Sequence, residues 1–401
     1  LIYVNPLKAL TRDLRERIEY YAHYVGLKVR PLYGDVVKSY RKPTPDIIIT
    51  TPESLKVILD WSPKWWQYLR AVRWVIVDEV HELLLSKRGY QLLVLLERLK
   101  EIAGRSLQRI GLSATIGNPE KIASLLGGSD GKVTVIEAED KREYNFEVKL
   151  AVPITDEEKE EPFLAAAKLI ANEIKRGIKT LIFTNSRYSA ERLQGVLSDL
   201  GTGCMVHHGS IGVEEREIFE DTFRTGLLRC IVATKTLELG IDIGDIEQVI
   251  QYRSPGQVSA LIQRAGRSKH RPGQKSTCKI ISTDPEDCLE SIAIVNLAKK
   301  KMLEDPLVIL KPLDVLAKEI IGISLHNYRG QKYLKNFRPI TAFKAYEIIR
   351  RSKIFESLTP HEYQNIIDFL KNENIIALKD DILPVSYTHL RAHETEADLV
   401  C

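Results

Sequence analysis

The stretch Trp74-Val-Ile-Val-Asp78-Glu79-Val-His81 decides the fold, because an apolar run ends there in two adjacent carboxylates. An apolar run of this length is typical of a parallel strand that is covered on both faces. In an open α/β sheet, ligands bind beyond the carboxyl ends of such strands. The stretch therefore predicts a strand that presents Asp78 and Glu79 to a ligand.

Similar apolar runs alternate with amphipathic stretches on both sides of this one. The strands predicted in the first part of the chain are Leu1–Asn5, Lys28–Leu32, Asp46–Thr50, Val72–Asp78, Gln108–Ser113 and Lys132–Glu137. Between them, Leu7–Val25 and Ser86–Ala103 have the periodicity of helices. This alternation predicts right-handed βαβ units and a doubly wound sheet.

The charged stretch Thr155–Glu161 marks a domain boundary, since the same alternation restarts after it. The strands predicted there are Lys179–Asn185, Cys204–His207, Leu228–Thr234, Gln248–Tyr252 and Lys275–Ser282. A third region begins near Pro312 with the helical patterns Leu313–Leu325, Thr341–Arg350 and Pro360–Lys371 and a short strand pattern, an order that suits a winged helix. The expected domains are residues 1–145, 146–310 and 311–384.

Residues 385–401 have neither helical nor strand periodicity, and they look like the translation of a sequencing adapter rather than native protein. The alternative is a polar native tail. At the other end, Leu1 is not an initiator Met and no secretory signal follows it, so the chain looks like the middle of a longer one.

Composition narrows the function classes. A chain of 401 residues suits two or three domains, and 44% hydrophobic with 28% charged residues is ordinary for a globular protein. No apolar run approaches the ~20 residues that cross a bilayer. The net charge of +4 permits a polyanionic partner without demanding one. The five cysteines show neither a CxxC pair nor a disulfide framework, which predicts a reducing, cytoplasmic compartment.

The paired carboxylates suit phosphoryl transfer. Such a reaction needs one carboxylate to hold Mg²⁺ through its water shell and another group to orient the attacking water. Asp78 fits the first role and Glu79 the second, while His81 is placed to sense the γ-phosphate. The alternative for these three residues alone is a strand that ends in solvated acids.

Other strand ends in the first domain also bear functional groups. Gly111-Leu-Ser113-Ala114-Thr115 is suited to linking nucleotide state with domain contacts. Asn5-Pro6-Leu-Lys8 and Thr50-Thr51-Pro52-Glu53-Ser54 are strand-to-helix junctions, whose free backbone N–H groups accept phosphates.

The second domain repeats this arrangement. The segments that follow its predicted strands are Phe183-Thr-Asn185-Ser-Arg187, His207-His208-Gly209-Ser210 and Ala233-Thr234 with Glu238-Leu-Gly240-Ile-Asp242. Gln263-Arg264-Ala-Gly266-Arg267-Ser-Lys269-His270 then gathers cations at one helix, and arginines of this kind can neutralise charge in a phosphoryl-transfer transition state. Each segment alone could be a solvated basic face or an ordinary turn. Their collinear order makes coincidence a poor explanation.

In this order the motifs resemble those of superfamily 2 DExH helicases, and within them the large helicase-related (Lhr) family. The likeness extends over about residues 1–384 and includes Val75–Glu82, Ser86–Gly89, Ile110–Pro119, Leu237–Gly244 and Lys311–Ala317. It implies an α/β fold of two tandem RecA-like parallel-sheet domains, the P-loop NTPase helicase core, plus a small winged-helix domain. It also implies ATP and Mg²⁺ as cofactors and single-stranded DNA or RNA and duplex junctions as partners, with no required protein partner. Family members are ATP-driven translocases with 3′-to-5′ polarity.

The resemblance also implies roles for individual residues. The catalytic residues would be Asp78, Glu79, Arg264 and Arg267, with Asp78 on Mg²⁺. Nucleotide would be contacted by Gly240, Asp242, Arg264, Arg267 and His270. Coupling would involve His81, Ser113, Ala114, Thr115 and Gln263. The nucleic-acid track would comprise Pro6, Lys8, Thr51, Pro52, Ser54, Asn185, Arg187, His208, Gly209 and Thr234.

The chain departs from the family pattern in three places. Lys269 replaces the usual glycine of the last motif, and His270 stands where many relatives have Arg. No G-x-x-x-x-G-K-[ST] loop occurs, and Gly127–Val133 has the wrong spacing for one. That loop should precede Leu1, so residues 1–401 alone are expected to hydrolyse ATP poorly or not at all.

Two other functions remain open from sequence: a DExH RNA helicase, and a non-catalytic nucleic-acid-binding cassette. Two residue groups are also ambiguous. Trp61, Trp65 and Trp66 form either core packing or a stacking platform for bases. The cations of the third region either guide nucleic acid or form an ordinary solvated face; they are Lys318, Arg329, Lys332, Lys335, Arg338, Lys344, Arg350 and Arg351.

Overall fold

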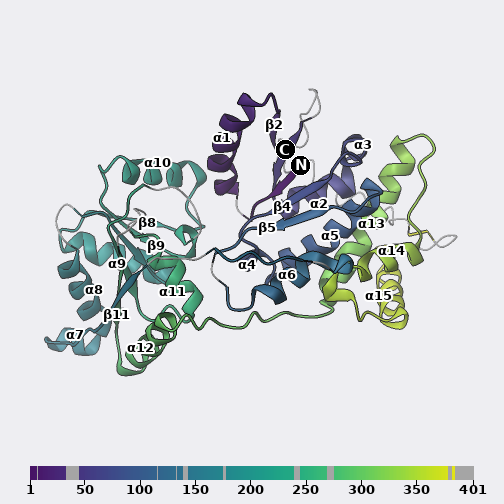
Figure 1. Ribbon diagram of the computed structural model, residues 1–401. Coiled ribbons are helices and arrows are strands. Elements are labelled where there is room, and N and C mark those ends of the chain that lie inside the picture. The colour runs from purple at the N-terminus through teal and green to yellow at the C-terminus, as the bar shows by residue number, and fades with distance from the viewer. Residues whose placement is uncertain are drawn as a thin grey trace. The chain divides into compact units, whose positions relative to one another are not determined.

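The computed structural model describes residues 1–6, 8–32, 45–114, 116–131, 133–138, 143–174, 178–238, 244–268, 275–377 and 382–383. The chain forms two compact units, and each contains one parallel sheet (Figure 1). Unit 1 comprises residues 1–114, 118–136 and 306–401, and unit 2 comprises residues 115–117 and 137–305. The prediction of two parallel α/β sheets is thereby confirmed.

The sheet of unit 1 has the order β2-β3-β1-β4-β5, and all its neighbours pair in parallel. Its strands are β1 (Ile2–Val4), β2 (Val29–Leu32), β3 (Ile47–Thr50), β4 (Trp74–Val77) and β5 (Gln108–Gly111). Val4 pairs with both Thr50 and Val77, and Val77 pairs with Gly111, so four strands end in register. Pro31 is tolerated because β2 lies at an edge, where one missing N–H donor does no harm.

Helices connect these strands as the amphipathic patterns predict. They are α1 (Lys8–Tyr24), α2 (Pro52–Trp61), α3 (Pro63–Leu69), α4 (Val80–Leu83), α5 (Lys87–Ala103), α6 (Pro119–Gly127) and the 3₁₀ turn η2 (Gly128–Asp130). Thr51 caps α2 and Ser86 caps α5, each accepting a backbone N–H three residues on. Gly89 permits the close approach of α5 to the preceding chain, since a Cβ there would lie 1.9 Å from the carbonyl oxygen of Leu83.

The third region packs onto the helices of unit 1. It consists of α13 (Leu313–Tyr333), α14 (Ala342–Arg350), the 3₁₀ turn η4 (Lys353–Phe355) and α15 (Pro360–Asn372), with one antiparallel bridge between Thr341 and Ile382. Figure 1 shows α13 and α14 beside the helices α2, α3 and α5, and α15 packs against α13. Their order is compatible with a winged helix, which stays a prediction because residues 378–381 and 384–401 lie outside the described part of the chain.

Buried charges connect α2, α5 and α13. Arg98 of α5 bonds Asp60 of α2 at 2.7 Å and Glu319 of α13 at 3.1 Å, and Lys56 bonds both carboxylates at 2.9 Å. Asp60, Arg98 and Glu319 are 1%, 3% and 0% exposed. Burial opposes ionisation of Asp60, but the charges of Lys56 and Arg98 hold its pKa below the ordinary value. Beside this cluster, His326 stacks on Trp66 with ring centroids 3.8 Å apart.

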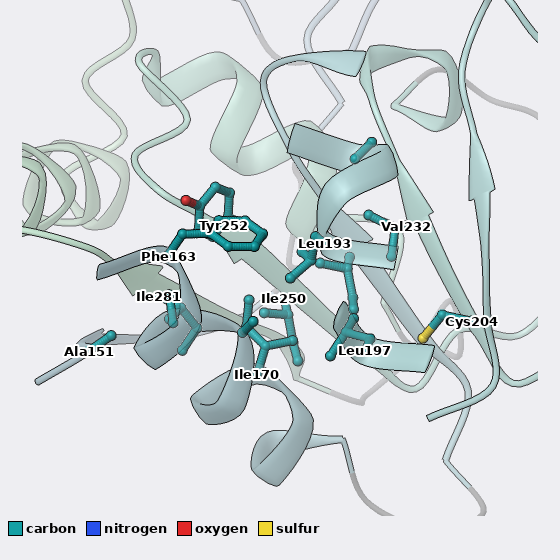
Figure 2. Packing of buried hydrophobic residues seen from close by; sticks show 14 of the residues in the cluster. Ala151, Phe163, Ile170, Leu193, Leu197, Cys204, Val232, Ile250, Tyr252 and Ile281 are labelled. Carbon is teal, nitrogen blue, oxygen red and sulfur yellow. The ribbon is translucent and has the colours of Figure 1, made fainter. Parts of the chain in front are cut away.

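The sheet of unit 2 has the order β6-β11-β10-β7-β9-β8, again with parallel neighbours. Its strands are β6 (Tyr144–Leu150), β7 (Thr180–Phe183), β8 (Cys204–His207), β9 (Cys230–Ala233), β10 (Gln248–Tyr252) and β11 (Ser276–Ser282). Its helices are α7 (Asp156–Glu160), α8 (Pro162–Glu173), α9 (Arg187–Asp199), α10 (Val213–Arg224), η3 (Lys235–Leu237, 3₁₀), α11 (Val258–Ala265) and α12 (Pro285–Lys299). One core cluster, in which Ile170, Leu193 and Ile250 are fully buried, fills the space between sheet and helices (Figure 2).

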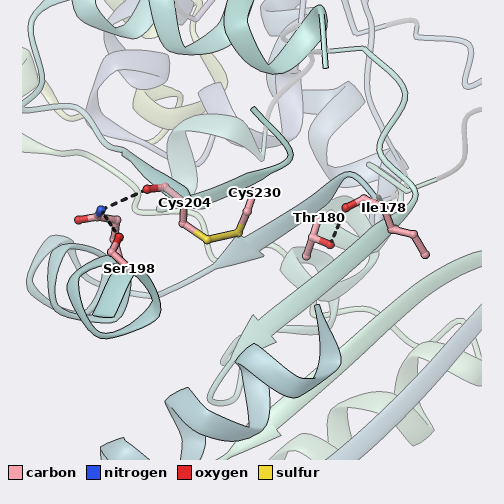
Figure 3. Close-up of a disulfide and its surroundings, with 6 residues drawn as sticks. Ile178, Thr180, Ser198, Cys204 and Cys230 are labelled. Carbon is pink, nitrogen blue, oxygen red and sulfur yellow. Dashed lines mark hydrogen bonds between the residues drawn. A yellow bond between two sulfur atoms is a disulfide. The ribbon is translucent and has the colours of Figure 1, made fainter. Parts of the chain in front are cut away.

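Three sequence predictions need correction in this part of the chain. Residues 133–138 form no strand; the strand is β6, which joins the second sheet through β11. The charged stretch at 155–161 is no boundary but α7 within unit 2, where Thr155 and Glu158 form a capping box. Cys204 and Cys230 form a disulfide, because β8 and β9 are neighbours and pair these residues in register with Cα atoms 4.7 Å apart (Figure 3).

Of the three tryptophans that could either pack in the core or stack on bases, two are packed in the core. Trp65 and Trp66 are each 5% exposed, and Trp66 donates its indole N–H to the Ile58 carbonyl. Among the described residues, no helix combines the length and apolar character needed to span a membrane.

Candidate nucleotide and nucleic-acid site

The carboxylate of Asp78 lies at the carboxyl end of β4, where it accepts hydrogen bonds from the neighbouring β1 segment and from the next residue. Tyr3 donates its hydroxyl to Asp78 Oδ2 at 2.9 Å, and Asn5 donates its side-chain amide to the same oxygen at 3.4 Å. The N–H of Glu79 donates to Oδ1 at 3.0 Å. These bonds orient the carboxylate, which stays half-buried and can still accept a ligand.

Tyr3 is a site residue that the sequence reasoning missed. Burial and the neighbouring charge of Asp78 raise its pKa well above the ordinary value, so the hydroxyl remains a donor at physiological pH. Its position in the middle of β1 reads as ordinary core, and only the register of β1 with β4 shows its contact with Asp78.

Glu79 has a left-handed backbone, with φ 47° and ψ 46°, which is uncommon for a residue other than glycine. Such strain tends to occur at functional sites and costs of order 1–3 kcal/mol. Here it turns the chain sharply from β4 into α4. Glu79 Oε2 then lies 3.6 Å from His81 Nδ1, which is 3.1 Å from the Ser113 hydroxyl beyond β5. Glu79, His81 and Ser113 thus form a polar chain across two strand ends.

The junctions after β1 and β3 are connected by Arg88. Its guanidinium donates to the Pro6 carbonyl at 2.7 Å and forms two bonds with Glu53 at the start of α2, at 2.5 and 3.1 Å. Burial opposes ionisation of Glu53, but the hydrogen bonds from Arg88 and the backbone keep its pKa below the ordinary value. Arg88 is a second residue that the sequence reasoning missed.

The predicted nucleic-acid contacts of unit 1 differ in accessibility. Thr51 and Ser54 are 2% and 5% exposed, and their hydroxyls bond each other at 3.2 Å. Pro6 and Pro52 are also buried, and the side chain of Lys8 lies outside the described part of the structure. Unit 1 therefore offers mainly backbone groups at these junctions. Ser113 and Ala114 are exposed, and Thr115 is outside the described residues.

In unit 2, the predicted residues also gather at strand ends. Phe183, Ala233 and Gln251 are in register, which brings Asn185, Thr234 and Ser254 to one edge of the sheet. Asn185 donates to the Ser254 carbonyl at 2.7 Å and borders a pocket of about 390 Å³ that Tyr252, Arg253 and Glu290 also line.

The residues that follow β7 and β8 meet at this edge too. Exposed Arg187 reaches the Ser210 hydroxyl at 2.5 Å. His208 is buried and lies 2.9 Å from Glu191, whereas Gly209 is exposed. Arg187 and Gly209 therefore present a cation and a bare backbone to solvent, groups that suit a phosphate.

Arg264 is engaged within unit 2. It is 6% exposed and bonds Glu238 and Asn185, both at 3.1 Å, and Gln251 at 2.8 Å. Arg267 is more accessible, and its Nε donates to the Glu238 carbonyl at 3.1 Å. The side-chain oxygen of Gln263 is buried and accepts no hydrogen bond from the described residues. Gly240, Asp242 and His270 lie outside the described part.

Comparison with known protein families also divides the chain into two domains. A DEAD/DEAH box helicase family model matches residues 1–122, and a helicase conserved C-terminal domain model matches residues 163–272. The chain is 36% identical to an ATP-dependent helicase Lhr-Core of Sulfolobus acidocaldarius, over 92% of this chain and 43% of the relative. It is 30% identical to an Lhr helicase/probable uracil glycosylase of Mycolicibacterium smegmatis, over 93% of this chain and 27% of the relative. The chain thus spans less than half the length of these curated relatives.

A solved structure gives the same result. The Mycobacterium smegmatis helicase Lhr bound to ssDNA and AMP-PNP matches with a TM-score of 0.83 and 29% identity, over 97% of this chain and 53% of that one. The two sheets are accordingly RecA-like α/β domains.

Proposed function

Because this chain belongs to the Lhr family of superfamily 2 helicases, we propose that it is the ATP-driven motor of a nucleic-acid helicase. The motor moves 3′ to 5′ along a single strand of DNA and unwinds DNA or RNA–DNA duplexes. The observation that supports this most is the oriented carboxylate of Asp78 beside the strained Glu79 at the carboxyl edge of the first sheet.

The carboxylates fit a nucleotide with Mg²⁺. Among the described residues, no group of three or more Asp, Glu, His or Cys side chains could hold a metal ion by itself. A magnesium–nucleotide site requires only one or two carboxylates, because phosphates and water supply the other ligands. Bound Mg²⁺–ATP supplies the phosphoryl group whose hydrolysis drives the motor. Asp78, held by Tyr3 and Asn5, would hold the metal's water shell, and Glu79 would orient the attacking water.

We assign distinct roles to the two arginines of unit 2. Arg267 meets the phosphates and neutralises transition-state charge, a contribution worth roughly 10³–10⁵ in rate. Arg264 is a positioning residue in the described conformation, since its guanidinium bonds Glu238, Asn185 and Gln251. Gly240, Asp242 and His270 complete the nucleotide contacts in this proposal. Asp78, Glu79 and Arg267 act on one nucleotide.

The nucleic-acid track follows the strand ends of both units. Backbone N–H groups at the start of α2, exposed Arg187 and the backbone at Gly209 can contact phosphates without reading sequence. Lys8, Asn185, His208 and Thr234 belong to the same track. The relative bound to ssDNA favours a DNA strand for this chain, and a DExH RNA helicase is the alternative.

Coupling between nucleotide and strand would pass through His81, whose Nδ1 lies near both the Glu79 carboxylate and the Ser113 hydroxyl. Ala114, Thr115 and Gln263 extend this path in the proposal. The buried, unsatisfied oxygen of Gln263 supports a role for this residue, since such an atom is costly unless a ligand or a moving segment bonds it.

We further propose that a phosphate-binding loop outside these 401 residues completes the site. β5 has one neighbour among the described strands, so its other edge can accept a further strand. Residues 1–401 alone should therefore turn over ATP poorly. A longer protein that also lacks such a loop would favour the non-catalytic cassette.

The test is Glu79→Gln in a longer protein that includes the loop, with exposed Glu120→Gln as the matched control. We expect the Glu79 variant to lose unwinding of a 3′-tailed duplex while it still binds the strand, and the Glu120 variant to keep both. Unwinding at the parental rate by the Glu79 variant would refute the assignment.

A further inference from the structure

The segment between Glu319 and Glu347 contains no acidic residue, although it contains Arg329, Lys332, Lys335, Arg338 and Lys344. Lys344 pairs with Glu101 and Glu347. The other four cations form no ion pair with any described carboxylate. A surface with this charge imbalance attracts polyanions.

Aromatic rings, rather than carboxylates, contact the cations in the last turns of α13. The Arg329 guanidinium lies 5.2 Å from the ring centroid of Trp61 and 4.9 Å from that of Tyr333. The ammonium group of Lys332 lies 5.6 Å from the ring of Tyr328 and 5.4 Å from that of Tyr333. Tyr333 itself is 54% exposed, so its ring has area available for a ligand.

The chain that follows α13 is held in place. A Cβ on Gly330 would lie 2.4 Å from the Phe337 ring, so only glycine lets this ring pack against the helix. Asn327 exchanges two hydrogen bonds of 2.8 Å with the backbone of Ile340. Asn336 makes the turn with a φ of 60°. The cations are therefore presented from a fixed backbone, which lowers the entropic cost of binding a ligand.

This surface is separate from the part of the proposed nucleic-acid track that lies in unit 1. α13 runs beside α2 in the same direction, since Lys56 bonds Glu319, the Leu59 carbonyl contacts His326, and the Trp61 carbonyl bonds Arg329. α2 begins at the carboxyl end of β3, and its ten residues extend about 15 Å from that end. The end of α13 therefore lies about one helix length from the strand-end residues of unit 1.

We propose that Arg329, Lys332, Tyr333, Lys335 and Arg338 form a second binding surface for single-stranded nucleic acid, which we call the α13 surface. The cations contact backbone phosphates, and the exposed ring of Tyr333 stacks on a base. A single strand fits better than a duplex because only unpaired bases offer their faces to a ring. This inference goes beyond the proposed motor track and does not depend on ATP hydrolysis.

The experiment measures binding of a fluorescein-labelled 20-nucleotide oligothymidylate to residues 1–401 by anisotropy over a salt series. The test variant is Arg329→Gln/Lys332→Gln/Lys335→Gln. The matched control is Lys299→Gln/Lys300→Gln/Lys301→Gln, which removes the same charge from exposed lysines at the end of α12, where the described structure has no cation–aromatic contact. Because each single-strand phosphate contact contributes ~0.7 to the slope of log K against log salt, we expect the test variant to lower that slope by about 2 and the control to leave it nearly unchanged.

A second variant, Tyr333→Leu, separates stacking from charge. We expect it to weaken oligothymidylate binding by ~5-fold or more at an unchanged salt slope, and to leave binding of a blunt duplex unaltered. An equal decrease of the salt slope in both triple variants would overturn the proposal, since net charge alone would then explain binding. A loss of duplex binding equal to that of the single strand in Tyr333→Leu would overturn the single-strand assignment. Arg187→Gln reports on the motor track separately, so either surface can fail without the other.

Discussion

Replacing Glu319 by Ala tests how the third region is attached to the first RecA-like domain. Glu319 is fully buried, and it accepts hydrogen bonds from Lys56, Gln91 and Arg98. The substitution removes one of the two carboxylates that balance Lys56 and Arg98, and Asp60 alone remains.

The structure sets the size of the effect. Breaking a buried ion pair costs about 3–5 kcal/mol, because the remaining charge is left without compensation. The Arg98 side chain is 3% exposed and cannot reach water, whereas that of Lys56 is 13% exposed and can be partly solvated. We therefore expect Glu319→Ala to lower the free energy of unfolding by about 3 kcal/mol, at the lower end of that range.

Tryptophan fluorescence during urea unfolding is the assay, since all four tryptophans lie between residues 61 and 74 and so report on unit 1 alone. With a urea m-value of about 2–3 kcal/mol/M, a loss of about 3 kcal/mol lowers the unfolding midpoint by about 1–1.5 M.

Asp314→Ala is the control on the same helix. Asp314 pairs with Lys87 at 2.5 Å, but the two side chains are 54% and 70% exposed, and such a pair contributes at most about 1 kcal/mol. If Glu319→Ala and Asp314→Ala shifted the midpoint equally, the account of the buried cluster would be refuted.

Three more predictions follow from single features. Burial lowers the pKa of His326 to about 4 from 6.5, so only the unfolded state gains a proton between these two pH values. The contribution of neutral His326 to the stability of unit 1 should therefore be complete above pH 6.5, and the free energy of unfolding should fall by about 1.4 kcal/mol per pH unit below it. In urea titrations at several pH values, His326→Leu should remove this part of the pH dependence. Gly89→Ala should lower the thermal unfolding midpoint by the equivalent of about 3 kcal/mol, because the added Cβ would clash with the Leu83 carbonyl. Gly195→Ala on α9, where the added Cβ meets open space, should leave the midpoint unchanged or raise it. An unchanged midpoint in Gly89→Ala would contradict the close contact. Alkylation under denaturing, non-reducing conditions should label three of the five cysteines, and five labelled thiols would exclude the disulfide. Reduction should lower the free energy of unfolding of unit 2 by about 3 kcal/mol, and it should have no such effect on the variant Cys204→Ala/Cys230→Ala.

The sequence predicted best the elements whose pattern is local. The β4 strand and the helix α5 depend on neighbouring residues, and the structure has them where the apolar run at 72–78 and the amphipathic stretch at 86–103 predict them. The prediction of a strand at 132–137 was wrong because an apolar pattern does not show whether a partner strand is available. The strand that forms is β6, which pairs with β11 of the second sheet.

Contacts between distant segments could not be predicted in the same way. Tyr3 and Asp78 are 75 residues apart, and Cys204 and Cys230 are 26 apart; each pair meets only because of strand order and register. The bonds of Arg264 to Glu238, Asn185 and Gln251 likewise arise at three strand ends. The motif therefore points to Arg264 as a candidate, and the tertiary structure is needed to propose what this residue does.

The central claim is that the acids of the first domain and Arg267 of the second act on one nucleotide. A double-mutant cycle of strand-stimulated ATP hydrolysis, with Glu79→Gln and Arg267→Ala in a protein that carries the proposed phosphate-binding loop, tests it most directly. Groups that serve one chemical step are strongly non-additive, so we predict that the double variant is no slower than the slower single variant. Losses that multiply in the double variant would contradict a shared nucleotide.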